Sequence, residues 1–495
     1  MKQILFITLV AVFFGCTKSD PIPAGEPDLN KHAIIKLDSI EDIGSDFVFI
    51  KGIIETHRIT DIDTIIACWN TQPNPTIDHN TLSLTAEINS YFIFRISGLQ
   101  PDENYYARLY VKFSDGSDKY SNELIFSPIS ITIVFEKEFL PYDGGYAAFV
   151  EKAIKTRSNN FIIGSQLLHK YNLEPKNAIT KIDAEGEIIW NNVLSFETQH
   201  EKIELIIELE NGTFIAFLSA YDYPSWVIHI VKLSSTGNII WQDTYDNYFS
   251  QDFRYAYKPE TNVISFIANV YTAQYSDLKA WVLISINHDG EIIEEVFNDT
   301  FYTGPKYLFT GNNELLICEN NLRLRKFDQL LNLVWESGGI NSLPNSNIID
   351  ISELNPVNNL LVLNSYYDAV GLIVMDQEGN LINEFSKGWD QFIVWPTNTL
   401  RVSSNEYLLM STKSYAPQFP FYTLTWLGKV SLEKGIIWQK EFGNAESNAR
   451  NPRGQFIFQT SENEFIIFGH ILRNYQDPYD DNIAKLWLSK IHISS

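Results

Sequence analysis

Cysteines, basic side chains and long apolar runs are all scarce in this sequence of 495 residues. It has three cysteines, and two of them, Cys68 and Cys318, fall in different predicted domains, so we expect no structural disulfide and exclude a cysteine-based metal site. Lys and Arg number 37 against 61 Asp and Glu. The resulting formal net charge of −24 excludes the basic face that nucleic-acid phosphates require.

No run beyond the N-terminus is long enough for a transmembrane helix. Helix-period patterns are also few, whereas aromatic residues make up 14% of the chain. Together these features predict an all-β protein.

The N-terminus carries a short apolar run, residues 4–14, after the basic Lys2. This run is too short to span a bilayer and suits the core of a signal peptide. It ends in FFGC at residues 13–16, and a small residue directly before a cysteine resembles the lipobox of bacterial lipoproteins, although its first two positions are usually Leu and Ala or Ser. The resemblance implies a signal peptide over 1–15 and an acylated mature N-terminus at Cys16. The alternative is an ordinary secretory signal with a chance cysteine.

A polar, proline-rich stretch follows the cysteine, reading TKSDPIPAGEPDLN over 17–30. With Cys16 it predicts a flexible tether over residues 16–30. Several acyl chains on Cys16 would anchor the protein firmly to a membrane. Since no Asp follows Cys16, the resemblance favours the outer membrane of a Gram-negative bacterium, facing either the periplasm or the outside.

Residues 31–128 are predicted to form a β-sandwich. Short alternating segments separated by turn signals indicate about seven strands in roughly a hundred residues. The stretch GLQPDENY, residues 98–105, resembles the tyrosine corner of fibronectin type III domains. That resemblance implies a buried, structural Tyr105 and a spacer or interaction module without chemistry. The predicted strands are 46–54, 65–69, 91–96, 104–113 and 122–126.

The rest of the chain, residues 129–495, repeats a hairpin pattern. Two clear copies read KIDAEGEIIW (181–190) and KLSSTGNIIW (232–241): a strand ending near Lys, a Gly-bearing turn, and a strand that starts with two branched apolar residues before Trp. Weaker copies bring the number of Trp-equivalent positions to six, about 40–55 residues apart, a spacing that suits propeller blades of four strands. These positions are 190, 241, 294, 335, 383 and 438.

A seventh copy begins at residues 486–491 and lacks its outer strand. Residues 131–140 carry the missing pattern, with Phe135 at the Trp position, and we predict that they complete the last blade from the other end of the region. The sequence therefore predicts a fibronectin type III-like sandwich followed by a seven-bladed β-propeller that an N-terminal strand closes. Because such a ring leaves no unpaired end, we expect a monomer.

The repeats resemble those of quinoprotein-like (PQQ-like) propellers, in which the Trp packs between blades. The family ranges from quinone-dependent dehydrogenases to scaffold lipoproteins of the outer-membrane barrel assembly machinery. The turn here is one residue shorter than usual, and no adjacent cysteine pair occurs, so an oxidoreductase gains little support and we predict no cofactor. We interpret the four repeat tryptophans as structural.

Motifs for phosphate binding, nucleophilic serine chemistry or a zinc His-Glu-x-x-His pair do not occur in the sequence. We predict no metal, and we interpret the acidic stretch 479–482 as a solvated loop. No local pattern singles out a catalytic carboxylate pair among the 61 acids.

Loops between the second and third strands of several units are rich in Tyr, Trp, Pro and Asp. They are predicted to share one face of the propeller, where aromatic faces beside polar groups suit a carbohydrate or a peptide. The alternative is that they merely cover the blade ends. The candidate ligand-binding residues are Tyr221, Tyr223, Trp226, Tyr366, Tyr367, Phe419, Tyr422, Tyr475 and Tyr479.

These observations predict a membrane-anchored cell-envelope lipoprotein that binds or scaffolds without catalysis, its ligand a glycan or an envelope protein. The main alternative is a glycosidase or lyase acting on polysaccharide at the central pocket. Two or three carboxylates about 5–10 Å apart in that pocket would favour the enzyme.

Overall fold

The computed structural model is all-β: the residues that it describes form strands and turns without helices. None of them belongs to a helix that is long and apolar enough to cross a membrane. Contacts divide the chain into two compact units, the larger containing Ser127–Ser495 with Ile40–Phe49 and Arg95–Asn104, and the smaller the rest. The described residues are 33–44, 46–56, 62–142, 146–169, 175–196, 198–222, 225–246, 248–249, 255–258, 261–271, 278–298, 306–310, 314–318, 323–337, 347–353, 360–366, 369–376, 380–388, 392–403, 405–415, 423–432, 435–443, 451–472 and 484–493.

Two sheets precede residue 127. One has the order β1–β2–β5, and the other β4–β3–β6–β7 with β8 paired to β6. Tyr105 is buried and its ring stacks on Phe126 with centroids 5.8 Å apart, as a structural role requires. All five predicted strands are present, and β1, β4 and β7 were not predicted. The strands are β1 (Ile34–Ile43), β2 (Phe47–Glu55), β3 (Ile62–Asn70), β4 (Asn80–Leu84), β5 (Tyr91–Ser97), β6 (Tyr105–Phe113), β7 (Asp118–Tyr120) and β8 (Leu124–Phe126).

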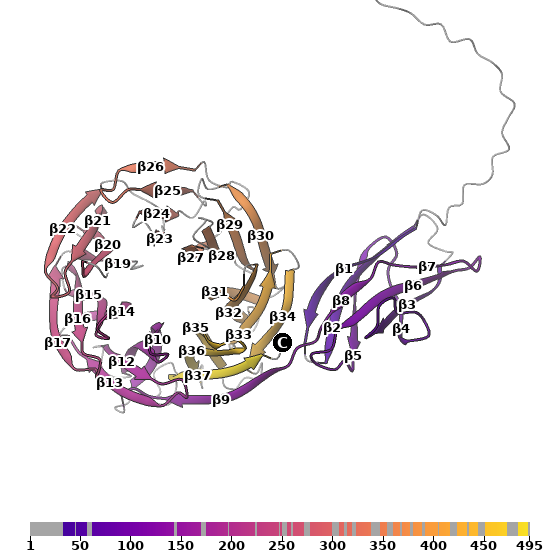
Figure 1. Cartoon of the computed structure of the whole chain (residues 1–495), viewed down its shortest axis with the longest axis horizontal. Helices are drawn as coiled ribbons and strands as arrows, with labels where there is room; N and C mark the ends of the chain where they lie inside the picture. The colour runs from indigo at the N-terminus through magenta and orange to yellow at the C-terminus, as the bar shows by residue number, and fades with distance from the viewer. Residues whose placement is uncertain are drawn as a thin grey trace, which may run out of the picture. The chain divides into compact units, whose positions relative to one another are not determined.

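The remaining described strands form seven antiparallel sheets arranged in a ring, which is a β-propeller (Figure 1). We number them ring sheets 1 to 7 in chain order. Sheet 1 is β10 (Tyr146–Lys155), β11 (Phe161–His169), β12 (Lys176–Ile182) and β13 (Ile188–Leu194). Sheet 2 is β14 (Gln199–Glu208), β15 (Phe214–Asp222), β16 (Ser225–Leu233) and β17 (Ile239–Asp246). Sheet 3 is β18 (Tyr248–Phe249), β19 (Tyr255–Lys258), β20 (Val263–Tyr271), β21 (Leu278–Ile286) and β22 (Ile292–Asn298).

The other four ring sheets repeat this order from the inner to the outer strand. Sheet 4 is β23 (Lys306–Phe309), β24 (Leu315–Cys318), β25 (Leu324–Phe327) and β26 (Leu333–Glu336). Sheet 5 is β27 (Asn347–Glu353), β28 (Leu360–Tyr366), β29 (Ala369–Met375) and β30 (Leu381–Gly388). Sheet 6 is β31 (Phe392–Arg401), β32 (Glu406–Tyr415), β33 (Thr423–Ser431) and β34 (Gly435–Phe442), and sheet 7 is β35 (Asn451–Ser461), β36 (Glu464–Leu472), β37 (Ala484–Ile493) and β9 (Ile131–Phe139).

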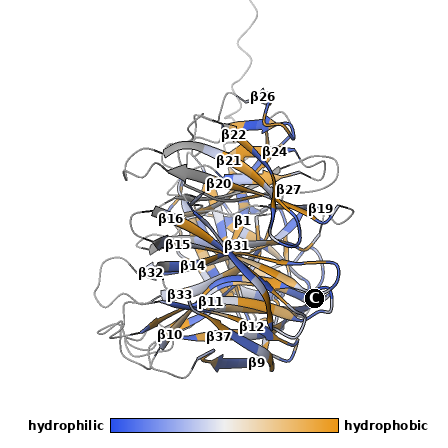
Figure 2. Cartoon of the chain, turned by 90° about the vertical axis from the view of Figure 1, so that its left-hand side faces the viewer, coloured by the Kyte–Doolittle hydropathy of each residue, from blue (hydrophilic) through white to orange (hydrophobic). Residues whose placement is uncertain are grey.

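The last ring sheet is built from both ends of the propeller region. Strand β9 pairs antiparallel with β37, so that Phe135 faces Lys490 and Phe139 faces Leu486. Phe135 and Phe139 also pack against a buried cluster shared by sheets 7 and 1. The predicted completion of the final sheet by residues 131–140 is thus confirmed. In Figure 2, β9 lies at the bottom and is blue over much of its length, as its run Glu136-Lys137-Glu138 requires.

The same register recurs in every ring sheet. Each Trp-equivalent residue follows the extra residue of a bulge in the fourth strand and faces a residue of the third strand: Trp190 faces Lys181, Glu294 faces Ser285, and Phe135 faces Lys490. In ring sheets 1 to 4 the turn between the third and fourth strands also places one residue in the left-handed region, as short hairpins commonly do. The residues at positive φ include Gly186 (+76°), Gly237 (+87°), Gly290 (+88°) and Leu331 (+60°).

The repeat tryptophans link neighbouring sheets. A Cβ atom added to Gly237 in sheet 2 would lie 2.6 Å from the ring of Trp190 in sheet 1, and one on Gly290 would lie 2.8 Å from Trp241. The Trp190 indole also donates to the carbonyl of Ser235 at 3.0 Å. Trp190 and Trp241 therefore each cover the glycine turn of the next sheet, which explains why that turn position has no side chain. The structural interpretation of Trp190 and Trp241 is confirmed.

Candidate functional site

The first strand of each ring sheet lines the inside of the ring (Figure 1). The first strand of every ring sheet starts on the same face of the ring. The hairpins between second and third strands therefore emerge on that face, together with the connections from one sheet to the next. We call this the link face. The bulged, glycine-bearing turns lie on the opposite face.

Two of the predicted ligand-binding residues form an aromatic corner on the link face. Tyr221 and Trp226 are a cross-strand pair near the tip of the β15–β16 hairpin. Their rings meet edge to face with centroids 5.2 Å apart, and both side chains are half-buried. Aromatic rings held in this way offer an apolar surface with polar rims to a ligand. The structure thus brings these two candidates together.

The other candidates lie mostly outside the described residues. Tyr366 ends β28, where it pairs with Ala369 in the corresponding hairpin of sheet 5. Those outside the described ranges are Cys16, Tyr223, Tyr367, Phe419, Tyr422, Tyr475 and Tyr479.

A buried polar network lies beneath the aromatic corner, and sequence reasoning missed it. Tyr221 pairs with Gln199 at the start of β14, two residues before Glu201. The Glu201 side chain is buried, and its carboxylate accepts hydrogen bonds from the Thr198 hydroxyl at 2.8 Å and the Asn177 amide at 3.0 Å. Burial raises the pKa of Glu201 to about 7, although these hydrogen bonds oppose the shift.

His229 extends this network into the third strand of sheet 2. Its Nε2 lies 3.1 Å from the Thr198 hydroxyl, and its Nδ1 lies 2.8 Å from the hydroxyl of Thr244 on β17. The imidazole also stacks on Phe196, with 4.1 Å between ring centroids and 5° between planes. The connection from sheet 1 to sheet 2 is therefore held by groups from several strands. This arrangement fixes the base of the β15–β16 hairpin.

A second polar cluster lies on the inner strands of sheets 1 and 2. Lys202 Nζ is 3.7 Å from a carboxylate oxygen of Glu151 and 3.4 Å from one of Glu204. The two acids therefore lie within about 7 Å of one another, on β10 and β14. Burial raises the pKa of both carboxyl groups, while Lys202 partly opposes the rise. Ser219 donates to Glu204 at 3.0 Å.

This second cluster was not predicted, because the two acids stand in unrelated units of the sequence. Both occupy bulges of their strands, where the register shifts between Val150 and Lys152 and between Ile203 and Leu205. An acid inside an apolar run, such as Glu204 in IELII (203–207), is the signal that could have drawn attention to the second of them. Glu204 is 3% exposed, so it reaches a ligand far less readily than the half-exposed Lys202 between the acids.

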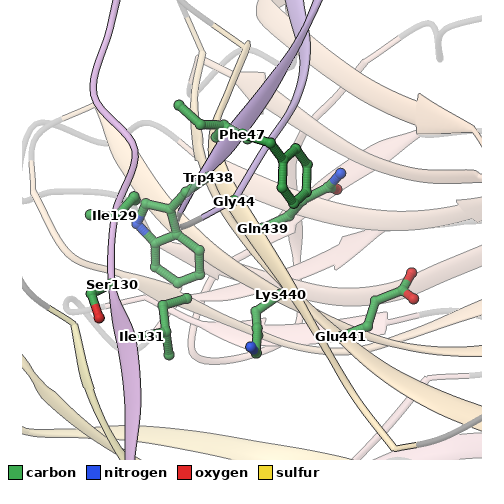
Figure 3. Close-up of a pocket in the computed structure, with 10 residues that line it drawn as sticks. Gly44, Phe47, Ile129, Ser130, Ile131, Trp438, Gln439, Lys440 and Glu441 are labelled. Carbon is green, nitrogen blue, oxygen red and sulfur yellow. The ribbon is translucent and has the colours of Figure 1, made fainter. Parts of the chain in front are cut away.

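A pocket on the outer side of the ring brings together Trp438 to Glu441 of β34 and the segment Ile129 to Ile131, whose last residue begins β9 (Figure 3). Lys440 and Glu441 are the charged side chains that it draws from these two segments. It lies on an outermost strand, whereas both polar networks begin on inner strands. It therefore belongs to neither of them.

No group of three His, Cys, Asp or Glu side chains that could hold a metal occurs within the described ranges. Neither Cys68 nor Cys318 forms a disulfide, and both are buried. The acidic stretch 479–482 lies outside the described residues.

Comparison with known proteins yields structural likenesses alone. No family model matches the chain, and no curated protein matches it either. BamB from Moraxella catarrhalis shares 10% identity over 72% of this chain and 99% of its own, with a TM-score of 0.34. The WD40 domain of SCAP from fission yeast shares 8% identity over 74% of this chain and 98% of its own, with a TM-score of 0.38.

A protein of unknown function from Bacteroides caccae is also similar, with 10% identity over 57% of this chain and 90% of its own, and a TM-score of 0.33. Because these TM-scores are all below 0.5, the three likenesses give no information on the function of this chain. The strand order and register described above identify the larger unit as a β-propeller.

Proposed function

We propose that the chain is a lipid-anchored envelope protein with a fibronectin type III-like sandwich and a seven-bladed propeller of the quinoprotein-like type. Seven ring sheets with one shared register support the blade count, and the FFGC sequence at residues 13–16 supports the anchor. The two sheets before residue 127 and the buried Tyr105 support the sandwich. The predicted location is the outer membrane of a Gram-negative bacterium.

The proposed role is non-catalytic binding of a glycan or of another envelope protein on the link face. The observation that carries this proposal is the aromatic corner of Tyr221 and Trp226. The Glu201–Thr198–His229 network lies at the base of the same hairpin and holds it in place. A fixed aromatic pair loses little side-chain entropy when a ligand arrives, which favours its use as a contact surface.

Binding can be tested with the full-length protein in detergent. A glycan array and a pull-down from envelope extract should each be run with the wild type and with the Tyr221→Ala/Trp226→Ala variant. Removing both rings should weaken ligand capture by about tenfold or more, since buried aromatic anchors dominate binding energy. Tyr91→Ala is the matched control, because Tyr91 is a 56% exposed aromatic residue of the sandwich. Equal capture by the wild type and the double variant would contradict the proposal.

A polysaccharide-acting enzyme is the second candidate, and the Glu151–Glu204 pair is the observation that favours it. Their separation of at most about 7 Å overlaps the range found between glycosidase carboxylates. We rank it lower because Lys202 contacts both acids and Glu204 is almost fully buried. The assay is the release of reducing ends from envelope polysaccharides. If the wild type and Tyr91→Ala release them and Glu151→Gln does not, the function is hydrolysis and not binding.

A further inference from the structure

Ring sheet 1 carries a cluster of aromatic and basic side chains at its link-face end. Tyr146 begins β10 and pairs with His169 at the end of β11. Lys176 begins β12 and pairs with Leu167. Residues 167 and 169 point to the same side of β11, so Tyr146, His169 and Lys176 share that side of the sheet. Tyr142 lies just ahead of β10, in the connection that leads from β9 into sheet 1.

The ammonium group of Lys176 lies over two aromatic rings. Its Nζ is 4.9 Å from the ring centroid of Tyr142 and 5.4 Å from that of Tyr146. The two tyrosine rings meet edge to face with centroids 5.3 Å apart, and the Tyr146 ring is 4.8 Å from the His169 ring. Tyr146 is 6% exposed, and Tyr142 packs against the buried cluster shared by sheets 7 and 1. Fixed rings therefore hold a half-buried cation in place.

The repeat does not require a lysine at this position. Lys176 stands five residues before Lys181, the residue that faces Trp190. The equivalent residues in ring sheets 2, 3, 5 and 6 are all apolar, and they are Val227, Ala280, Ala369 and Leu424. Sheet 7 has Lys485 there, and no aromatic ring contacts it within the described ranges. The cation over two rings is thus particular to sheet 1.

Lys176 also has no acidic partner in the part of the chain that the structure describes, although acids outnumber bases in the sequence. Other propeller lysines do lie beside a carboxylate, at N–O distances of 2.7, 2.9 and 3.1 Å for Lys326–Glu314, Lys429–Glu406 and Lys490–Glu464. An ordered cation without a protein carboxylate is free to pair with an anionic group of a ligand. The charge of the ligand at this point should therefore be negative.

We propose that the cluster of Tyr142, Tyr146, His169 and Lys176 binds an acidic sugar residue, with its carboxylate beside Lys176 Nζ and its ring against the tyrosines. The inference rests on the proposed binding of a glycan on the link face, and it specifies that glycan as a polysaccharide containing uronic acids. An acidic peptide matches the charge equally well. Tyrosine rings, which combine an apolar face with a polar rim, favour the sugar, because a sugar ring also combines apolar and polar surfaces.

The test uses labelled oligomers of galacturonic, glucuronic and mannuronic acid, each compared with its methyl ester, which has the same backbone without the charge. Fluorescence anisotropy with the full-length protein in detergent should show that at least one acidic oligomer binds and that its ester binds at least tenfold more weakly. Affinity for the acid should fall as salt rises. Lys176→Met removes the charge and keeps a long side chain, so it should weaken binding of the acid by about tenfold or more and leave binding of the ester unchanged.

The matched control is Lys485→Met, since Lys485 holds the same register position in sheet 7 without the rings. It should bind as the wild type does. Both variants should melt with the wild type, because apolar residues fill this position in four other ring sheets. The inference is overturned if no uronate oligomer binds, if Lys176→Met binds the acid as tightly as the wild type, or if an oligomer of glutamate binds as tightly as the sugar.

The Tyr221→Ala/Trp226→Ala variant separates this inference from the proposed function. If neutral glycans bind through Tyr221 and Trp226 while uronates do not bind, the proposed function stands and this inference falls. If the double variant binds uronates as the wild type does while Lys176→Met does not, the acidic-sugar site stands and the aromatic corner loses its proposed role.

Discussion

Ring sheets 2 and 4 have the same strand order, but they differ in the length of their strands and in the residue at the left-handed turn position. Sheet 2 has strands of eight to ten residues and a glycine turn at Gly237, with φ of +87°. Sheet 4 has four strands of four residues each, and Leu331 takes the turn position with φ of +60°. The comparison shows that strand register and the left-handed turn define the repeat. Strand length and the identity of the turn residue are free to vary.

The largest expected effects come from the cores of the two sheets. Phe217 of sheet 2 is fully buried and contacts Phe266 edge to face at 4.9 Å, so Phe217→Ala should lower the free energy of unfolding by about 3–5 kcal/mol. Ile317 of sheet 4 is equally buried, and Ile317→Ala should cost about 2–5 kcal/mol. Urea denaturation measures both. If Ile317→Ala left the midpoint of the main urea unfolding transition unchanged, sheet 4 would not unfold together with the rest of the ring.

The glycine turn of sheet 2 should be the next most sensitive position. Gly237→Ala forces a side chain into a left-handed conformation and against Trp190, at a cost of about 2–4 kcal/mol. Gly212→Ala is the matched control, since Gly212 also has positive φ (+76°) but nothing lies within 4 Å of its added Cβ. It should cost about 1–2 kcal/mol, from conformation alone. Equal losses at the two glycines would rule out the tryptophan contact as a source of stability.

The buried Glu201 of sheet 2 should make stability depend on pH. Its folded pKa of about 7 is above the ordinary value of 4.5, so the folded state keeps a proton that the unfolded state releases between these pH values. The contribution of Glu201 to stability is then fully present below pH 4.5 and is lost as the pH rises towards 7, by on the order of 1–3 kcal/mol.

Glu201→Gln should flatten this part of the stability–pH curve. Thermal melts between pH 4.5 and pH 8 would measure the slope for both proteins. Glu208→Gln serves as the control, because Glu208 is a partly exposed acid at the other end of the same strand. A slope that Glu201→Gln leaves unaltered would show that Glu201 ionises normally.

The smallest effect is expected at Leu331 of sheet 4, where two terms oppose each other. Leu331→Gly relieves a left-handed leucine, worth about 1–2 kcal/mol, but removes an apolar side chain that is 6% exposed and packs against Trp281 and Phe327. Burial of a leucine contributes about 1.5–3 kcal/mol. The net loss should be about 1 kcal/mol in denaturant melts. A gain in stability would mean that backbone strain outweighs packing at this turn.

Much of the propeller could be predicted from the sequence because its signals are local. The Lys–turn–Gly–Trp pattern at 181–190 specifies a bulged hairpin, and the structure places Lys181 opposite Trp190. The outer-strand pattern at 131–140 could be assigned to the last ring sheet because a closed ring needs a partner for its last strand. Even where Leu331 or Glu294 replaces the expected residue, the spacing preserved the register.

The polar networks could not be predicted, because they depend on contacts between distant strands. Glu201 is joined to Asn177 and Thr198 across two sheets, and Glu151 reaches Lys202 through bulges that no sequence pattern marks. For the aromatic loops, the residues could be predicted but their contacts could not. Their composition predicted a surface, yet it indicates nothing about how the rings are arranged. Tyr221 and Trp226 meet because the β15–β16 register pairs them.

The central claim is that residues far apart in the chain close the ring, and hydrogen–deuterium exchange of the full-length protein tests it directly. The amides of Ile131–Phe139 that bond to β37 should exchange as slowly as those of β37 itself, since both belong to one cooperative sheet. Exchange of β9 at the rate of an open loop, while β37 remains protected, would contradict this account of the fold.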